Sequence, residues 1–440
     1  MTHGQTEINV RDMDPRRFGK WASGDYAIAK SVDEYEQMYQ PHLPGEFREA
    51  GRPTRVTPLY EPLKQAGALY GDTFGWERAK WYAAKGEKEN YSFRRNNSFT
   101  AVAEECKAVR ERVGLTDLTS FSKYEVSGKD ALGFLERLCA NRVPTKAGGI
   151  VLSQMLTEKG GIESEATIAC LAENHYYLLS AAVAELHDFD WLVQHIQKGE
   201  DVSVTNVTEG FGVLLLTGPL SRDVLLTLTD IDLSNESGFT WMRAREISVS
   251  GIPVRALRVS YVGELGWELH CPMSRLAELD EALMRAGESH GIRRFGTYAM
   301  NSLRMEKAYK GWGSELTTEI SLVESDMLRF ARKSGGYIGA DVVELKNQNG
   351  VSTHLVYCEV DAVDADPMGN EPVLDGDKII GITTSGAYGH YVEKSLAFAY
   401  VDSGYELPES SFEIRILGKK CRAKVLPNAV WDSENKKLRS

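Results

Sequence analysis

Two long stretches of the chain each alternate helical and strand patterns, and this double alternation constrains the fold more than any other feature. In the first, apolar residues at helical spacing over 99–113 precede a strand pattern at 123–127, and a later helical pattern covers 182–197. In the second, an apolar strand at 211–217 leads to two helical patterns that end near residue 307. Mixed elements in this order are typical of α+β domains, so the sequence predicts two such units, although no exact repeat is visible.

The remaining expected elements fit the same two units. Further helices are predicted at 58–69, 130–139, 221–228, 274–290 and 296–307. Further strands are predicted at 151–156, 165–171, 175–180, 244–249, 253–260 and 267–270.

The two ends of the chain differ from its middle. From about residue 350, short strand patterns are separated by Gly, Pro and Asp-Gly turns such as Asp375-Gly376, which predicts a terminal β-barrel or sandwich of roughly 90 residues. The N-terminal residues have weak periodicity beyond a short helix expected from Ser31 to Tyr39, so they are expected to form an arm on the body.

The length of 440 residues favours several domains. The expected organisation is an arm at 1–51, a region at 52–340 with two α+β domains, the inserted one at about 100–200, and a C-terminal β-barrel domain at 341–440.

The net charge of −12 at pH 7 argues against a nucleic-acid partner, because phosphate backbones are bound by clustered Lys and Arg. The longest basic runs are pairs such as Lys419-Lys420. No apolar run reaches membrane-spanning length, and the polar N-terminus lacks the apolar stretch of a signal peptide. We therefore expect a soluble, cytoplasmic protein with neither a nucleic-acid nor a membrane partner.

The sequence carries no motif for a metal or a dinucleotide. No CxxC, HExxH or HxH spacing occurs, so no metal site is predicted. No GxGxxG lies between a strand and a helix, and we therefore expect no flavin or nicotinamide domain within this sequence. The cysteines are scattered and are expected to be reduced, mostly core residues: Cys106, Cys139, Cys170, Cys271, Cys358 and Cys421.

Three glycine-containing polar segments, at 159–167, 260–268 and 302–313, are the candidates for chemistry. In the first, two glycines allow a close turn, and two carboxylates two residues apart on a strand point to one face. The second brings Tyr261 and two further carboxylates to a turn between strands, and the third is a helix that ends at glycines. By spacing alone these segments are also typical of structured surface turns.

The order of motifs along the chain resembles a known family. The motifs are VTPLYEPLKQAG, SFSKYEVSGKDALGFLERL, KGGIESEATI, FGVLLLTGPLSRDVL, SYVGELGWELH and NSLRMEKAYKGWGSELT. They resemble the glycine-cleavage T-protein (aminomethyltransferase) family, and most closely the folate-binding C-terminal region of dimethylglycine and sarcosine dehydrogenases. The resemblance runs from about Arg52 to the end, and the arm segment Asp14 to Gly19 is similar to the segment that precedes this region in those dehydrogenases.

The resemblance implies an α+β, three-domain ring in which two α+β domains with antiparallel sheets and a C-terminal β-barrel surround a central tetrahydrofolate cavity. It places Tyr261 and Glu268 where the family contacts the folate. Glu165 falls at the position of an aspartate credited with assisting the transfer, so Glu165 and Tyr261 are the catalytic candidates. Trp312 and Tyr388 are candidate walls of the cofactor cavity, as is Trp76.

Glu165 departs from the family's aspartate by one methylene. Its carboxylate must therefore be displaced, or its backbone must be reset, relative to the family pattern.

Three functions follow from the resemblance. In the leading hypothesis the protein is a demethylase, a methyltransferase of one-carbon metabolism that moves a methyl group from a small activated donor to tetrahydrofolate. The donor would be a sulfonium, a quaternary or tertiary amine, or a methyl ether. A second hypothesis is the folate subunit of a split dimethylglycine or sarcosine dehydrogenase, which forms methylenetetrahydrofolate with a separate flavoprotein. A third is a non-catalytic folate-binding protein.

Overall fold

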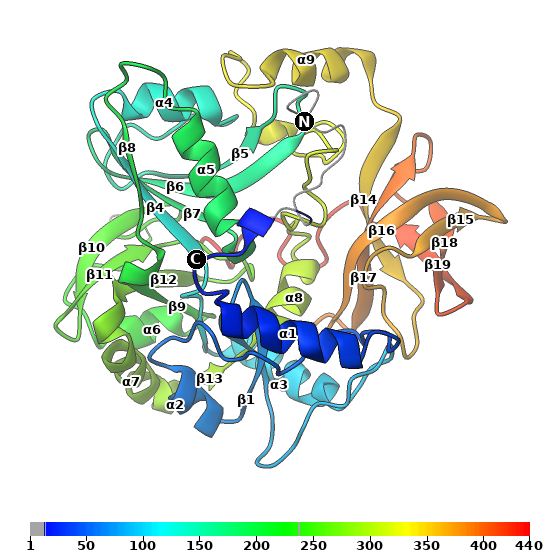
Figure 1. Ribbon diagram of the computed structural model, residues 1–440, viewed down its shortest axis with the longest axis horizontal. Coiled ribbons are helices and arrows are strands. Elements are labelled where there is room, and N and C mark those ends of the chain that lie inside the picture. Colours follow the sequence, from blue (N-terminus) through cyan, green and yellow to red (C-terminus); the bar gives the residue numbers. More distant parts are fainter. Residues whose placement is uncertain (1–12, 14, 236–237) are drawn as a thin grey trace.

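The computed structural model describes residue 13 and residues 15–235 and 238–440. Figure 1 shows three groups of elements around the helix α8: a sheet with two helices at the upper left, a second sheet with its helices at the lower left, and a barrel at the right. The expected α+β class with antiparallel sheets is confirmed.

The first sheet has six strands in the order β10-β11-β12-β9-β3-β13, and every pairing except that of β13 with β3 is antiparallel. Apolar side chains at alternate positions of its strands, such as Leu214, Leu216 and Trp267, are fully buried against α6 and α7. The strands are β3 (Gly114–Asp117), β9 (Phe211–Thr217), β10 (Ala244–Val249), β11 (Ile252–Leu257), β12 (Gly266–Pro272) and β13 (Arg293–Arg294).

The second sheet is antiparallel throughout, with five strands in the order β5-β6-β7-β4-β8. Along β6 the even positions from Ile162 to Ile168 are buried, and Ala166 and Ile168 lie in the core with α4, whereas Glu163, Glu165 and Thr167 are only half-buried on the opposite face. The strands are β4 (Ser122–Ser127), β5 (Ile150–Leu156), β6 (Ile162–Ala172), β7 (His175–Ser180) and β8 (Ser203–Asn206).

The two sheets meet through a small apolar cluster. Ala169 and Tyr177 from the five-stranded sheet pack there with Ala244 and Leu257 from the six-stranded sheet. Ala169 lies on the same face of β6 as Glu165, because the two residues are an even number of positions apart. The half-buried face of β6 is therefore directed toward the other sheet.

The C-terminal strands form a closed barrel in the order β14-β17-β16-β15-β18-β19, so the barrel alternative is confirmed over the sandwich. Its interior is apolar, with Val356, Ala397, Ala399 and Ile414 buried. The helix α9, just before the barrel, was not predicted. The strands are β14 (Thr353–Val360), β15 (Pro372–Asp375), β16 (Lys378–Gly389), β17 (Lys394–Asp402), β18 (Ser411–Ile416) and β19 (Lys419–Val425).

The helices mostly follow the predicted ranges, with small shifts at their ends. They are α1 (Gly24–Glu36), α2 (Tyr60–Gln65), α3 (Ser98–Glu111), α4 (Ala131–Leu138), α5 (Glu185–Gln194), α6 (Ser221–Leu226), α7 (Leu276–Gly287), α8 (Thr297–Glu306) and α9 (Ala340–Asn349).

Two predictions near the N-terminus were wrong in their boundaries. The helix expected from Ser31 begins at Gly24 instead, because the Ser23 hydroxyl caps it by accepting from the Tyr26 N–H at 3.3 Å. The helix expected at 58–69 ends at Gln65, since Gly67 turns the chain with φ +97°. A hairpin of β1 (Ala68–Thr73) and β2 (Trp76–Tyr82) follows. Asp14 of the predicted arm segment lies outside the described residues.

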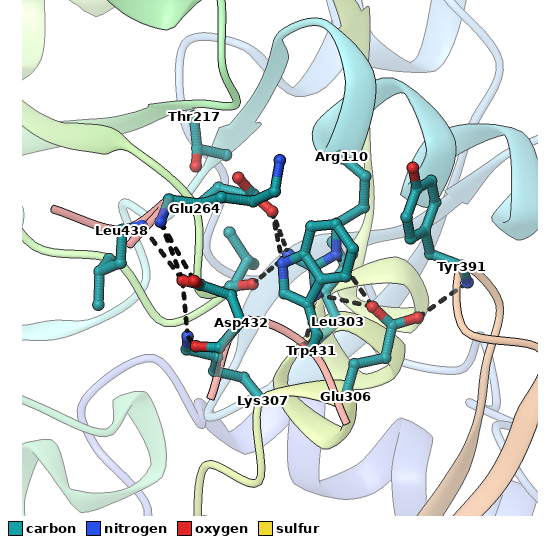
Figure 2. Close-up of polar contacts among 12 residues, drawn as sticks. Arg110, Thr217, Glu264, Leu303, Glu306, Lys307, Tyr391, Trp431, Asp432 and Leu438 are labelled. Atoms are coloured by element: carbon teal, nitrogen blue, oxygen red, sulfur yellow. Dashed lines mark hydrogen bonds and ion pairs between the residues drawn. The ribbon is translucent and has the colours of Figure 1, made fainter. Parts of the chain in front are cut away.

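One buried guanidinium joins three segments that are far apart in the sequence. Arg110 of α3 is 2% exposed and donates to Glu264 at 2.9 Å and to Glu306 of α8 at 2.7 Å. It also donates to the Val262 carbonyl at 2.7 Å. Figure 2 shows Trp431 beside this group, where its indole N–H donates to Glu264 at 2.7 Å. The loop from Val262 to Glu264 is thus tied to two helices and to the C-terminal segment.

The substitution Arg110→Met should destabilise the protein by about 3–5 kcal/mol, because it keeps most of the buried stem but leaves the Glu264 and Glu306 carboxylates without their cation. Chemical denaturation measures this change. The matched control is Arg285→Met, whose guanidinium is exposed and 4.0 Å from Glu281, and which should stay within about 0.5 kcal/mol of wild type. Equal effects of the two substitutions would contradict the role assigned to Arg110.

Candidate functional site

The five predicted site residues come from all three parts of the molecule. Glu165 lies on β6, Tyr261 in the turn between β11 and β12, and Glu268 on β12. Trp312 lies in the loop after α8, and Tyr388 lies on β16 of the barrel.

Glu165 is held by its cross-strand neighbour. It pairs directly with Gln154 of β5, and the Gln154 side-chain amide donates to the carboxylate at 2.6 Å. Burial raises the pKa of Glu165 to about 7, although the hydrogen bond from Gln154 and the nearby charge of Lys310 act to lower it. A carboxyl with a pKa near neutrality can both take up and release a proton at physiological pH.

Tyr261 lies close to Glu165. Its hydroxyl donates to the Lys310 carbonyl at 3.2 Å, and its ring stacks on Tyr309 with the centroids 6.1 Å apart. Burial, together with the carboxylates of Glu315 and Glu165, raises the pKa of Tyr261 to about 12 against the effect of Arg304. The residue is nevertheless 37% exposed.

Glu268 is half-buried. It contacts His270, which in turn contacts Tyr177, and both of these side chains are buried. The His270 Nε2 lies 3.4 Å from the carboxylate, and the His270 Nδ1 lies 3.1 Å from the Tyr177 hydroxyl. Burial lowers the pKa of His270 although its bond to Glu268 opposes this, so the ring is neutral and carries one N–H. Both contacts are satisfied when Tyr177 donates to Nδ1 and Nε2–H donates to Glu268. One carboxylate oxygen is then held, while the other stays available.

Lys123 is a buried amine in the same region. Its ammonium donates to the carbonyls of Thr119 and Phe121, both at 2.7 Å. Burial lowers its pKa to about 7, while Asp117, Glu185 and Glu268 act to raise it. Glu268 therefore lies within electrostatic range of a group that can carry a positive charge.

Trp312 connects the loop after α8 to β6. Its indole N–H donates to the Glu163 carbonyl at 3.1 Å, two residues before Glu165. Its ring centroid lies 6.4 Å from that of His187, which is itself bonded to the Glu163 carboxylate at 2.5 Å. The structure therefore places Trp312 beside the strand that carries Glu165.

The contacts of Tyr388 and Trp76 lie elsewhere. Tyr388 packs under the Arg95 guanidinium at 4.2 Å and against Phe99 at 5.1 Å. Trp76 is only 3% exposed and packs under Arg55 at 4.2 Å. Such burial fits a core residue better than the cavity wall expected from the sequence.

Glu315 is a buried residue that the sequence reasoning missed. One of its oxygens accepts from Thr384 at 2.7 Å and from Ser385 at 2.6 Å, both on the barrel strand β16. The other accepts from the Gly311 N–H at 2.7 Å and from Arg304 at 3.3 Å. Glu315 thus joins the loop that carries Trp312 to the barrel and to α8.

Of the other residues near the site that the sequence did not predict, His270 is the one that a sequence pattern could have indicated. It lies two residues from Glu268 on a predicted strand, and period-two alternation places such residues on one face. Gln154 and Tyr177 lie on other strands, and only the strand pairing and the packing of the sheets bring them to the site.

The described part of the chain lacks two further features. No helix within it is long and apolar enough to cross a membrane, and no group of three or more metal-binding side chains occurs in it. A small cavity near α2 contains none of the five predicted residues; it is lined by Thr57, Tyr60, Leu63, Tyr70, Glu77, Arg78, Ala79, Asp117 and Ser120.

Three family models match the chain. The GCVT N-terminal domain matches residues 59–334, and the glycine cleavage T-protein C-terminal barrel domain matches residues 354–432. The central domain of FAD-dependent oxidoreductases matches residues 3–57, which include the arm.

The relatives agree with these matches. The chain is 38% identical to mitochondrial dimethylglycine dehydrogenase of Mus musculus over 96% of its own length but 49% of the relative, so it spans about half of that protein. It is 30% identical to the aminomethyltransferase of Geobacillus sp. (strain WCH70), with 84% of this chain and 96% of the relative covered. The structure of glycine cleavage system aminomethyltransferase T from Bartonella henselae superposes with a TM-score of 0.75 and 24% identity, covering 86% of this chain and 98% of that one. The T-protein-like fold expected from the sequence is confirmed.

The Glu165 carboxyl should titrate with an apparent pKa near 7, well above the ordinary value of 4.5, because its surroundings disfavour the charged form. Carbon-13 NMR of glutamate side-chain carboxyls measures this, with the signal assigned by its absence in Glu165→Gln. The wild-type spectrum must be compared with that of Glu165→Gln because burial also raises the pKa of Glu105 to about 7. Lys310→Met should raise the pKa of Glu165 further, since it removes a nearby cation. A signal that titrates near 4.5 would show that the site is open to water.

Proposed function

Because the chain belongs to the glycine cleavage T-protein (aminomethyltransferase) family, we propose that it is a tetrahydrofolate-dependent one-carbon transferase. More specifically, we propose a demethylase that moves a methyl group from a small donor to tetrahydrofolate. The donor would be a sulfonium, a quaternary or tertiary amine, or a methyl ether. The observation that carries the proposal is the Glu165 carboxyl, which the cross-strand Gln154 amide holds at 2.6 Å and whose pKa burial raises to about 7.

The residues present fit a reduced pterin, because they offer acceptors for its donors. The pterin edge presents adjacent N–H groups, which a carboxylate such as that of Glu268 can accept together. The Gln154 Oε1 and Ser260 Oγ atoms are buried and have no partner within the described structure. Buried polar atoms are normally paired, so a ligand with N–H donors would complete these two groups.

The chain's own residues would align the reactants and manage the proton. Tetrahydrofolate, when bound, supplies a nucleophilic nitrogen for the incoming carbon. Glu268, steadied by His270, would hold the pterin edge, and the ring face of Tyr261 would pack beside it. The Glu165 carboxylate would take the proton that the acceptor nitrogen loses and stabilise positive charge before that loss. The donor's leaving group would depart with its bonding electrons, which suits a donor that is already activated.

A second candidate function is favoured by the match of residues 3–57 to the central domain of FAD-dependent oxidoreductases. In this reading the protein is the folate-binding part of a dimethylglycine or sarcosine dehydrogenase type of enzyme, and it forms methylenetetrahydrofolate together with a flavoprotein. A screen of methylated donors with tetrahydrofolate, in which methyl- and methylene-folate are separated by mass, distinguishes the two. Methyl-folate formed by the purified chain alone supports the demethylase.

Glu268→Gln should weaken tetrahydrofolate binding by about tenfold or more, because a charge-assisted hydrogen bond contributes about 1.5–3 kcal/mol and the amide replaces one acceptor by a donor. Isothermal titration calorimetry under anaerobic conditions measures the dissociation constant. The matched control is Glu278→Gln, which alters an exposed carboxylate paired with Arg275 on the surface. An unchanged dissociation constant in Glu268→Gln would remove Glu268 from the site.

The transfer rate should rise with pH through an apparent pKa near 7 and level off above it, because the ionised form of Glu165 accepts the proton. The raised pKa means that the protonated, inactive form predominates below pH 7. Glu165→Gln should lower the rate by about 100-fold or more and abolish this limb of the profile. Single-turnover assays between pH 5.5 and pH 8.5, roughly 1.5 units either side of the pKa, measure both effects. A profile of unchanged shape in Glu165→Gln would assign the limb to another group.

A further inference from the structure

The arm helix α1 presents its polar face to the protein. None of its residues is buried, and those that approach the body most closely include Tyr26, Lys30 and Asp33. The Lys30 ammonium donates to the Arg48 carbonyl at 2.9 Å. The inner contacts of α1 are therefore largely polar.

The opposite face of α1 carries a stripe of exposed apolar side chains. Ile28, Val32 and Tyr35 are 65%, 53% and 77% exposed, and Tyr39, just beyond the helix, is 91% exposed. The spacing of four and three residues places Ile28, Val32 and Tyr35 along one side of the helix, and Tyr39 follows beyond its end. We refer to these four residues as the outer stripe. A surface helix normally has the reverse arrangement, with its apolar stripe toward the core.

The outer stripe is presented on an anchored segment. Trp21, just before α1, packs against Phe74 of the β1–β2 turn at 5.5 Å and against Tyr26 at 5.1 Å. Beyond α1, Arg48 is bonded to Glu34 at 2.8 Å. In Figure 1, α1 lies near the middle of the view, below α5 and to the right of the six-stranded sheet. A helix fixed at both ends in this way can offer a preformed surface to a partner.

We propose that the outer stripe is the docking surface for an FAD-containing oxidoreductase. This inference rests on the second candidate function, and it names the surface through which the flavoprotein is held. Contiguous apolar groups on an otherwise charged surface mark interaction sites. The segment that carries them, residues 3–57, is the part of the chain that matches a domain of FAD-dependent oxidoreductases. An oxidoreductase that contains FAD is therefore the partner that this segment favours.

The interface extends beyond α1. A helix of 13 residues is about 20 Å long, and one face of it cannot supply the roughly 800 Å² per partner of a stable complex. Phe18, at 42% exposed, and Met13, at 84% exposed, lie in the same arm and add apolar area. The flavoprotein would therefore contact the arm on both sides of Trp21.

The test compares three versions of the full chain, each tagged and purified under native conditions from its source organism. They are wild type, the outer-stripe variant I28D/V32D, and the control V363D/I379D, which places the same charges at two exposed apolar positions of the barrel region. The probe is protein-bound FAD, measured by its absorbance near about 450 nm, and mass spectrometry identifies the co-eluting protein. Wild type and control should carry an FAD-containing oxidoreductase, and the outer-stripe variant should carry at least tenfold less.

Three outcomes would overturn the proposal. They are the absence of FAD from the wild-type eluate, equal FAD in the outer-stripe variant, and a wild-type dimer in light scattering that I28D/V32D converts to a monomer. The last would make a second copy of the chain the occupant. Circular dichroism and tetrahydrofolate binding, unchanged across the three versions, show that they are folded. If wild type fails to bind tetrahydrofolate, the proposed function fails, whereas loss of FAD in the outer-stripe variant alone still supports the docking surface.

Discussion

The guanidinium of Arg110 is the constraint on which the candidate site depends. A buried cation needs carboxylates and carbonyls around it, and Arg110 finds them in the turn before β12 and at the end of α8. The same turn carries Tyr261, and the strand that follows carries Glu268. The chain after α8 carries Lys310 and Trp312. One desolvated charge therefore fixes the relative positions of the two segments that supply most of the site.

The site is rich in acceptors, and its cations are placed at the edges. Glu165, Glu268 and Glu315 each have at least one side-chain bond from the protein, which keeps their carboxylates in place. The amines near them, Lys123 and Lys310, are both buried enough that their pKa values are lowered. The charge of the region can thus change near neutral pH, which suits the proposed binding of a donor-rich ring and the proposed proton transfer.

The sequence predicted the elements whose periodicity is strong and missed those that depend on distant contacts. The helix α3 and the strand β9 were placed within a residue or two, because their apolar spacing is regular. The strand β3 and helix α9 were missed; β3 is short and is defined by its pairing with β9. Similarly, the family motif indicates Glu165, but nothing local indicates Gln154, which the register of β5 and β6 places opposite it. The domain boundaries at 51/52 and 340/341 stay predictions.

The bond between Trp431 and Glu264 has a consequence for the order in which the protein matures. These residues are 167 positions apart, and contacts of such separation form late because the intervening chain must first be ordered. During synthesis, the turn with Glu264 leaves the ribosome long before the segment that completes its hydrogen bonds. A nascent chain therefore lacks the Trp431 bond to this turn, and that bond can form after the last strands have been made. The candidate site is in this sense completed late in synthesis.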